Sequence, residues 1–261
     1  MPSLMITSSE NNRVKQVRAL LTQAKQRRQE QQCVLEGVRL IEDALLARVQ
    51  PDFVLYRPDA DLRISAAAEI LNRLQAQNIP CLVVEPTIFN KLSDTQNPQG
   101  ILAVCPLPEL APRQPLSLVL ILDGIADPGN LGSALRTAGA VGVDLVILSP
   151  DTVDPFNPKV LRGGMGAHFR LPIQQQTWAE IGQLGLPLVI ADADGERHIF
   201  EMDWTTPVAL VVGNEAHGPS QNARVIASQV IRIPMVSAES LNAAMAASVI
   251  LYEIFRQRHY A

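Results

Sequence analysis

Cysteine is scarce in this 261-residue chain, which contains only Cys33, Cys81 and Cys105. These residues form no CxxC pair and no cluster with histidine, so the sequence indicates neither a zinc site nor a disulfide framework. Isolated thiols are typical of a reducing compartment, and we expect a cytoplasmic protein. No apolar run approaches the ~20 residues that a membrane-spanning helix needs. The short apolar start at residues 1–5 does not resemble a signal peptide, so we expect no association with a membrane.

The chain also has no excess of basic charge. It contains 22 Lys and Arg residues and 26 Asp and Glu residues, which gives a net charge of −4. This sum argues mildly against a nucleic-acid partner. Residues 11–29 are an exception, because they contain no acidic residue. Their basic residues are Arg13, Lys15, Arg18, Lys25, Arg27 and Arg28. A local basic face can neutralise phosphates on an acidic protein. A solvated helix surface explains the same run equally well, and charge alone does not decide between them.

Phosphate-binding glycine motifs are absent as well. The loop at residues 213–218 contains neither G-x-G-x-x-G nor the Lys-Ser/Thr pair of a P-loop. A nicotinamide oxidoreductase would need that fingerprint after a strand and a ribose-binding acid about twenty residues later. Residues 123–128, which follow an apolar run, do not provide it. The sequence therefore argues against NAD and ATP as ligands.

The apolar pattern predicts a first α/β series in residues 1–105. Strands are expected at residues 33–35, 53–56, 80–84 and 101–105, and helices at residues 12–30, 37–46 and 66–77. Four prolines in the next ten residues favour extended backbone and predict an interdomain linker at residues 106–116. The chain thus divides into a small domain at 1–105, the linker, and a larger domain at 117–261.

The larger domain shows a second α/β series. Strands are expected at residues 118–122, 145–148, 188–191, 208–212 and 230–235, and helices at residues 130–140, 158–162 and 241–256. The run at 118–122 is continuously apolar, as in a buried parallel strand. The proline in 233–235 cannot donate to a sheet ladder, which favours an edge position for that segment.

Three polar blocks carry the chemistry, at residues 127–137, 213–220 and 237–248. The second and third follow apolar strands, which suits two loops that converge on one ligand at the carboxyl edge of a sheet. From spacing alone, Asn130 is as well explained as a helix N-cap and Arg136 as a solvated helix residue. Glu215 either closes its loop by accepting backbone hydrogen bonds or orients Arg136 through a bidentate bond.

Together the three blocks resemble the motifs of the SpoU/TrmH group of SPOUT RNA 2′-O-ribose methyltransferases. The resemblance covers about residues 117–258, and a fourth stretch at 157–169 shares it. Gly163-Gly164 stands in that stretch where relatives more often have Ala-Ser, a mild departure that bears on the stiffness of the loop.

The resemblance implies a mainly parallel sheet with a deep trefoil knot, and a homodimer that forms through this domain with its site at the subunit interface. The matching arginine of the family is the proposed catalytic residue and the matching asparagine a positioning residue. The residues implied in catalysis are Arg136, Asn130, Glu215, Ser240 and Asn242. The cofactor implied is S-adenosyl-L-methionine, held near Gly213, Ile233, Met235 and Leu241. Whether Arg136 or a substrate phosphate takes the proton stays open.

The implied substrate is a ribose 2′-hydroxyl in structured RNA, ribosomal RNA in preference to transfer RNA. Residues 35–40 resemble part of the ribosomal-protein-like substrate-binding domain that precedes the catalytic domain in many SpoU-type enzymes. On this reading the RNA-binding residues of the small domain are Arg13, Lys15, Arg18, Arg27 and Arg28. A non-catalytic RNA-binding or ribosome-assembly protein is the alternative, and a test for methyl transfer separates the two.

Overall fold

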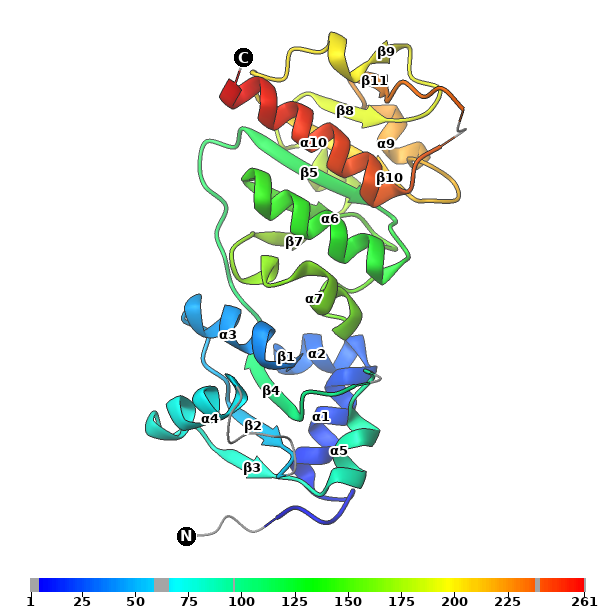
Figure 1. Ribbon diagram of the computed structural model, residues 1–261. Coiled ribbons are helices and arrows are strands. Elements are labelled where there is room, and N and C mark those ends of the chain that lie inside the picture. Colours follow the sequence, from blue (N-terminus) through cyan, green and yellow to red (C-terminus); the bar gives the residue numbers. More distant parts are fainter. Residues whose placement is uncertain (1–4, 59–65, 96, 238–239, 261) are drawn as a thin grey trace. The chain divides into compact units, whose positions relative to one another are not determined.

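A computed structural model describes residues 5–58, 66–95, 97–237 and 240–260 (Figure 1). The chain forms two compact units. The first comprises Met1–Pro108 and Phe156–Phe169, and the second comprises Glu109–Pro155 and Arg170–Ala261. The second unit is therefore not the continuous stretch 117–261 that the sequence predicts. The reason is that Leu161 and Phe169 are buried in the hydrophobic core of the first unit.

The first unit is built on a four-stranded sheet in the order β1-β4-β2-β3. Its strands are β1 (Gln32–Glu36), β2 (Phe53–Tyr56), β3 (Cys81–Val83) and β4 (Ile101–Pro106). Strand β4 runs antiparallel to both β1 and β2, whereas β2 and β3 are parallel. Because successive side chains of a strand point to opposite faces, the apolar runs of these strands supply two cores.

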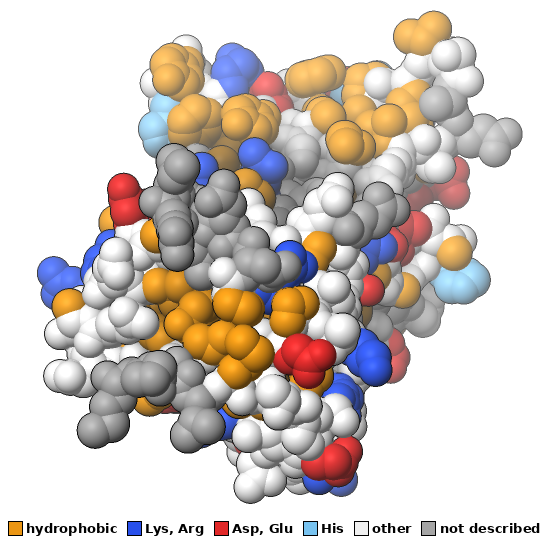
Figure 2. Space-filling view, turned by 60° about the horizontal axis from the view of Figure 1, so that its bottom comes forward, with side chains coloured by type: hydrophobic (Ala, Val, Ile, Leu, Met, Phe, Trp, Pro, Cys, Tyr) orange, Lys and Arg blue, Asp and Glu red, His pale blue; other side chains and the backbone are white. Residues whose placement is uncertain are grey.

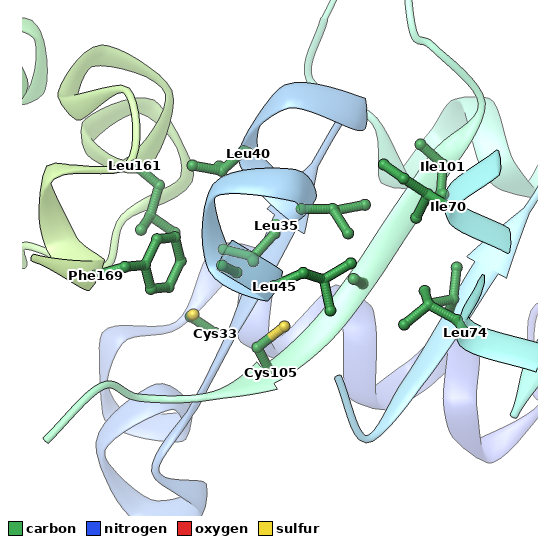
Figure 3. Close-up of a cluster of buried hydrophobic side chains, with 14 of the residues drawn as sticks. Cys33, Leu35, Leu40, Leu45, Ile70, Leu74, Ile101, Cys105, Leu161 and Phe169 are labelled. Carbon is green, nitrogen blue, oxygen red and sulfur yellow. The ribbon is translucent and has the colours of Figure 1, made fainter. Parts of the chain in front are cut away.

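One core lies between the sheet and α3 (Val38–Leu46), α4 (Ala66–Ala76) and α7 (Pro158–Gly164). Figure 3 shows its members, with Cys33 and Cys105 on directly paired positions of β1 and β4. The other core lies on the opposite face of the sheet. It joins Val34 and Phe53 to α1 (Asn12–Thr22) and α5 (Pro86–Leu92). Helix α5 was not predicted from the sequence.

The helix predicted at 12–30 is two helices. Helix α1 ends at Thr22, because the next residue, Gln23, has extended backbone angles (φ −124°, ψ 110°), and α2 (Ala24–Glu30) follows. This break turns Arg27 inward, where its side chain is only 3% exposed. The Arg27 guanidinium donates to the carbonyl oxygens of Leu20 and Leu21 at the end of α1. The prediction that Arg27 contacts RNA is therefore wrong for this structure, because the residue caps a helix and is not accessible to phosphate.

Replacing Arg27 with alanine is expected to lower the free energy of unfolding by roughly 1.5–3 kcal/mol, since it leaves buried carbonyl groups without a charged donor. Thermal denaturation of the full-length protein measures the change. The exposed neighbour Arg28 provides the control, and Arg28→Ala should leave the midpoint nearly unchanged. Equal midpoints for the two variants would show that the buried contact contributes nothing to stability.

The second unit is built on a seven-stranded, entirely parallel sheet in the order β7-β6-β5-β10-β8-β11-β9. Its strands are β5 (Leu118–Asp123), β6 (Leu145–Leu148), β7 (Ile173–Gln175), β8 (Leu188–Ala191), β9 (Arg197–His198), β10 (Val208–Gly213) and β11 (Gln229–Arg232). Strand β11 lies inside the sheet, between β8 and β9. The edge position predicted for 233–235 is therefore wrong: the strand ends at Arg232, before the proline that could not donate to the ladder.

Helices cover the faces of this sheet. One face packs against α8 (Trp178–Ile181) and α9 (Gln221–Ile226) through Ile181 and Ala223. The helices α6 (Pro128–Val141) and α10 (Ala243–Tyr260) lie side by side, and α10 also contacts β10 (Figure 1). Two short 3₁₀ helices, Ala167–Phe169 in the first unit and Ile199–Glu201 in the second, complete the secondary structure. No helix within the described ranges has the length and apolar character needed to cross a membrane.

Candidate active site

A pocket of about 370 Å³ opens at the carboxyl edge of the parallel sheet, where β8, β10 and β11 end. Parallel strands end at the same edge, so the loops that follow them meet there. The loop after β8 contributes Asp192 and Asp194, and the loop after β10 contributes residues 213–219. From the segment after β11 and the start of α10 come Ile233, Met235, Ser240, Leu241, Ala243 and Ala246.

The loop after β10 folds back on itself. Asn214 and Gly218 exchange two backbone hydrogen bonds, with N···O distances of 3.1 and 2.9 Å. A side chain at Gly213 would overlap the backbone of Gly218 and Pro219, so this position requires glycine. The Asn214 side chain donates to the carbonyl oxygen of Gly124 at 2.6 Å, which ties the loop to the end of β5.

A buried carboxylate anchors the far end of the same loop. Asp123, 4% exposed at the end of β5, accepts a hydrogen bond from the Ser220 backbone N–H at 2.7 Å. Its other oxygen accepts from the Ser149 hydroxyl at 2.9 Å. The loop is thus held at both ends by β5 and β10, which are paired in the centre of the sheet. The loop therefore borders the pocket in a fixed arrangement.

Hydrogen bonds connect three of the sequence-predicted catalytic residues. Asn130 Nδ2 donates to Glu215 Oε1 at 2.6 Å, and Asn242 Nδ2 donates to Asn130 Oδ1 at 2.8 Å. The Asn130 amide uses both of its polar atoms to join the loop after β10 to the start of α10. The sequence blocks at 127–137, 213–220 and 237–248 therefore meet at one point.

Asn130 is not the N-cap of α6. Asp127 caps that helix by accepting from the Asn130 backbone N–H at 2.9 Å, and Pro128 takes the first helical position. Asn130 lies one turn inside, which frees its side chain for the contacts with Glu215 and Asn242. At α10 the cap is Asn242, whose Oδ1 accepts from the backbone N–H groups of Ala244 and Met245. Ser237 and Ser240, which precede Asn242, do not make these bonds; Ala238 and Glu239 lie outside the described residues.

Arg136 lies apart from this cluster. It is exposed on α6 and does not line the pocket, and its side chain makes no hydrogen bond or ion pair with another described residue. Glu215 accepts its hydrogen bond from the Asn130 side chain, and neither of the two contacts considered from the sequence, with backbone N–H groups of its own loop or with Arg136, is seen among the described residues. One helical position on, Thr137 and Ser248 share a hydrogen bond of 2.9 Å between α6 and α10. Arg136 therefore faces solvent beside the helix pair.

All four residues predicted to hold a cofactor, Gly213, Ile233, Met235 and Leu241, line the pocket. Glu215 and Ser240 line it too, whereas Asn130 and Asn242 lie behind Glu215 in the hydrogen-bonded chain. Sequence reasoning missed the pocket residues Asp192 and Arg224, which form an ion pair. Asp192 could have been found, because it directly follows the apolar run at 188–191 and so stands at the carboxyl edge.

Comparison with known protein families gives this arrangement a context. The profile described as the SpoU rRNA Methylase family matches residues 117–252. The chain belongs to the SpoU rRNA methylase family. A second profile, the MRM3-like substrate binding domain, matches residues 11–103. The two matches lie on either side of the segment 107–116, in which the structure has no helix or strand.

Individual members of the family are similar over nearly the whole chain. The 23S rRNA (guanosine(2553)-2′-O)-methyltransferase RlmP of Bacillus subtilis is 32% identical over 95% of this chain and 98% of its own length. The 23S rRNA (uridine(2479)-2′-O)-methyltransferase of Streptomyces viridochromogenes is 31% identical over 98% of this chain and 94% of its own. A crystal structure of the SpoU methyltransferase AviRb from that organism, in complex with AdoMet, superposes with a TM-score of 0.80 at 31% identity. The superposition covers 96% of this chain and 100% of the AviRb chain.

Proposed function

We propose that this protein transfers a methyl group from S-adenosylmethionine to a ribose 2′-hydroxyl in structured RNA, with ribosomal RNA as the substrate in preference to transfer RNA. The observation that carries the proposal is the chain from Glu215 through Asn130 to Asn242 at the rim of the pocket. The preference for ribosomal RNA draws support from the names of the relatives in Bacillus subtilis and Streptomyces viridochromogenes.

The pocket suits S-adenosylmethionine in size and charge. A volume of about 370 Å³ lies in the range of small-molecule sites. Three carboxylates line it, from Asp192, Asp194 and Glu215, against the one guanidinium of Arg224 among the described lining residues. This excess of negative charge favours a ligand that carries a positive sulfonium. When bound, the cofactor supplies the electrophilic methyl group.

The polar residues at the rim are placed to orient the acceptor ribose. Asn130 is fixed by Glu215 on one side and Asn242 on the other, so none of these side chains needs to reorganise during the reaction. Ser240 is exposed at the pocket and offers a hydroxyl to the ribose. Alignment of the 2′-hydroxyl with the methyl group supplies much of the acceleration in such a transfer.

Arg136 is the remaining catalytic residue in the proposal. A guanidinium keeps its charge in proteins, so Arg136 is a poor direct base. We assign it to the substrate phosphate next to the reacting ribose, which then accepts the proton from the 2′-hydroxyl. The exposed position of Arg136 on α6 suits contact with a large polyanion.

A homodimer that forms through the second unit is part of the proposal. Helix α10 carries exposed apolar side chains at helical intervals: Met245 (59% exposed), Val249 (41%) and Tyr252 (56%). Leu241, 40% exposed, continues this stripe next to the pocket. A contiguous apolar patch of this kind is typical of an interaction surface. A twofold contact through it would bring the pocket and Arg136 to the subunit interface.

Replacing Met245 with aspartate is expected to convert a dimer into monomers, because the charge would be buried at the centre of the stripe. Size-exclusion chromatography with light scattering measures the mass. Phe200→Asp is the matched control, since Phe200 is 61% exposed in the same unit and lies outside α10. A dimer that survives Met245→Asp unchanged would place the interface elsewhere.

We further propose that the first unit binds RNA backbone through Arg13, Lys15, Arg18 and Arg28, all of which are exposed. Lys15 is paired with Glu10 at 2.8 Å, and Arg13 lies over the Phe53 ring at 4.3 Å from its centroid. Arg18 and Arg28 are therefore the stronger candidates. Figure 2 shows Lys and Arg side chains at several separate places on the face that it draws.

Replacing Arg18 and Arg28 with alanine together is expected to weaken RNA binding and reduce its dependence on salt. The slope of log K against log salt should become shallower by about 0.7 for each single-strand phosphate that the variant no longer neutralises. Filter binding across a salt series gives the slope. Arg48 and Arg73, two arginines outside the basic run, serve as the doubly substituted control. An unchanged slope in the Arg18/Arg28 variant would show that these basic residues only form a solvated helix face and do not contact RNA.

Three finer features complete the proposal. The C-terminal blocks form a deep trefoil knot, which is supported by the resemblance of these blocks and by the insertion of β10 between β5 and β8. The first domain is of the ribosomal-protein-like type. The protein acts in the cytoplasm, where its ribosomal substrate would be made.

Mapping 2′-O-methyl groups in total RNA by mass spectrometry, with and without this protein, tests the proposed function. One ribose methylation should disappear from ribosomal RNA in the cells that lack it and return with the wild-type gene. Loss of a transfer-RNA methylation instead would change the substrate, and an unchanged map would favour the non-catalytic RNA-binding alternative.

A further inference from the structure

An ion pair between Asp192 and Arg224 lines the pocket, and the function proposed above uses it only for its charge. Asp192 follows β8 directly, and its carboxylate is only 10% exposed. Its partner Arg224, on α9, is 41% exposed. Both side chains line the pocket, and the other acids there, Asp194 and Glu215, are exposed. Asp192 is thus the shielded carboxylate among the described lining residues.

The sheet places Asp192 between the two segments proposed to hold the cofactor. Ala191 is in register with Val212 of β10 and with Ile231 of β11, so Asp192 stands between Gly213 and Arg232 at the carboxyl edge. The turn after it is closely packed, because a side chain at Gly195 would overlap the backbone of Ile231. The backbone that carries Asp192 is therefore held close to β11 at the edge of the pocket.

The Asp192 carboxylate has unused hydrogen-bond acceptor positions. An ionised carboxylate offers about four lone-pair positions. Among the described residues two donors reach it: the Asp194 backbone N–H, at 3.0 Å from Oδ1, and the Arg224 guanidinium, at Oδ2. One position on each oxygen is left, which matches two adjacent hydroxyl groups. Arg224 would repel an ammonium group placed here, whereas neutral hydroxyls meet no such repulsion.

We propose that Asp192 binds the 2′- and 3′-hydroxyls of the cofactor's ribose, with Arg224 as a positioning residue that holds the carboxylate in place. The inference rests on the proposed use of S-adenosylmethionine. An acid after a neighbouring parallel strand serves the same purpose in other nucleotide sites at sheet edges. Asp192 then fixes the nucleoside part of the cofactor, and the residues near Asn130 act on the acceptor ribose.

Titration calorimetry on the full-length protein tests this with three ligands: S-adenosylhomocysteine, its 2′,3′-dideoxy analogue, and 5′-methylthioadenosine, which lacks the amino-acid part. Asp192→Asn should weaken S-adenosylhomocysteine and 5′-methylthioadenosine equally, by about tenfold or more, the size expected when hydrogen bonds to a charged acceptor are removed. The dideoxy analogue should bind wild type and variant alike. Glu196→Gln removes a carboxylate from an exposed residue of the same unit that does not line the pocket, and it should alter none of the three affinities.

Two outcomes overturn the proposal. Equal losses for all three ligands, reproduced in Arg224→Gln, would make the ion pair a structural clamp. A loss for S-adenosylhomocysteine without a loss for 5′-methylthioadenosine would assign Asp192 to the amino-acid ammonium. Thermal denaturation confirms that each variant is folded, and Asp192→Ser gives the same readout should the asparagine variant not fold. If the wild-type protein binds none of these ligands, the proposed function itself fails, and that result is distinct from both outcomes.

Discussion

Replacing Arg136 with alanine is expected to lower the rate of methyl transfer by about a hundredfold or more, the size seen when a group that stabilises developing charge is removed. Cofactor affinity and thermal stability should stay close to wild type. The structure supports the second part of this expectation, because the Arg136 side chain is exposed on α6, lies outside the pocket lining and contacts no other described residue through a hydrogen bond or ion pair. A rate assay with radiolabelled S-adenosylmethionine and ribosomal RNA measures the first part, and calorimetry the second.

Lysine at position 136 should also be poor. It keeps the charge, but its ammonium group cannot make the planar, two-point contact with a phosphate that a guanidinium makes. The matched control is Arg113→Ala, an exposed arginine of the same unit outside the cofactor pocket, which should keep the wild-type rate. If Arg136→Ala retains more than about a tenth of the rate, roughly 1.4 kcal/mol of barrier, Arg136 has no role in the chemistry.

The strands of both units were the most predictable part of the fold. Strands β2, β6 and β8 have the bounds that the apolar runs predicted. Such runs are informative because the strands are buried on both faces, which leaves few polar residues to blur the pattern. The two-residue β9 and the polar β7 were missed, because pairing with a neighbouring strand, and not their own composition, makes them strands.

The site was predictable where a loop followed a buried strand, since the topology then fixes its place. Gly213 and Ile233 come to the pocket for this reason. Side-chain direction was not predictable. A basic run on a helix gives no sign that a break at Gln23 will turn Arg27 into the protein. Likewise, Asn130 resembled a cap because the competing cap, Asp127, lies only three residues before it.

Replacing Gly213 with alanine is expected to abolish cofactor binding and methyl transfer together. The added Cβ would overlap the Pro219 nitrogen and the Gly218 carbonyl group, which are backbone atoms of the folded-back loop and cannot turn away. Overpacking of this kind lowers the free energy of unfolding by about 3 kcal/mol or more where the neighbouring atoms cannot move away. The melting temperature should fall by roughly 10 °C for a chain of this size. Calorimetry with S-adenosylmethionine and thermal denaturation measure the two effects.

Gly182→Ala is the matched control for this substitution. Gly182 ends α8 with ordinary helical angles, and a Cβ there would meet its nearest neighbour, the Trp178 carbonyl oxygen, at 3.5 Å. Alanine should therefore be tolerated, with cofactor affinity unchanged. Should Gly213→Ala not fold, Asn214→Ala tests the same loop without a clash, because it removes the bond to the Gly124 carbonyl. That variant should remain folded and bind the cofactor more weakly. Wild-type affinity in Gly213→Ala or in Asn214→Ala would mean that the shape of this loop does not determine cofactor binding.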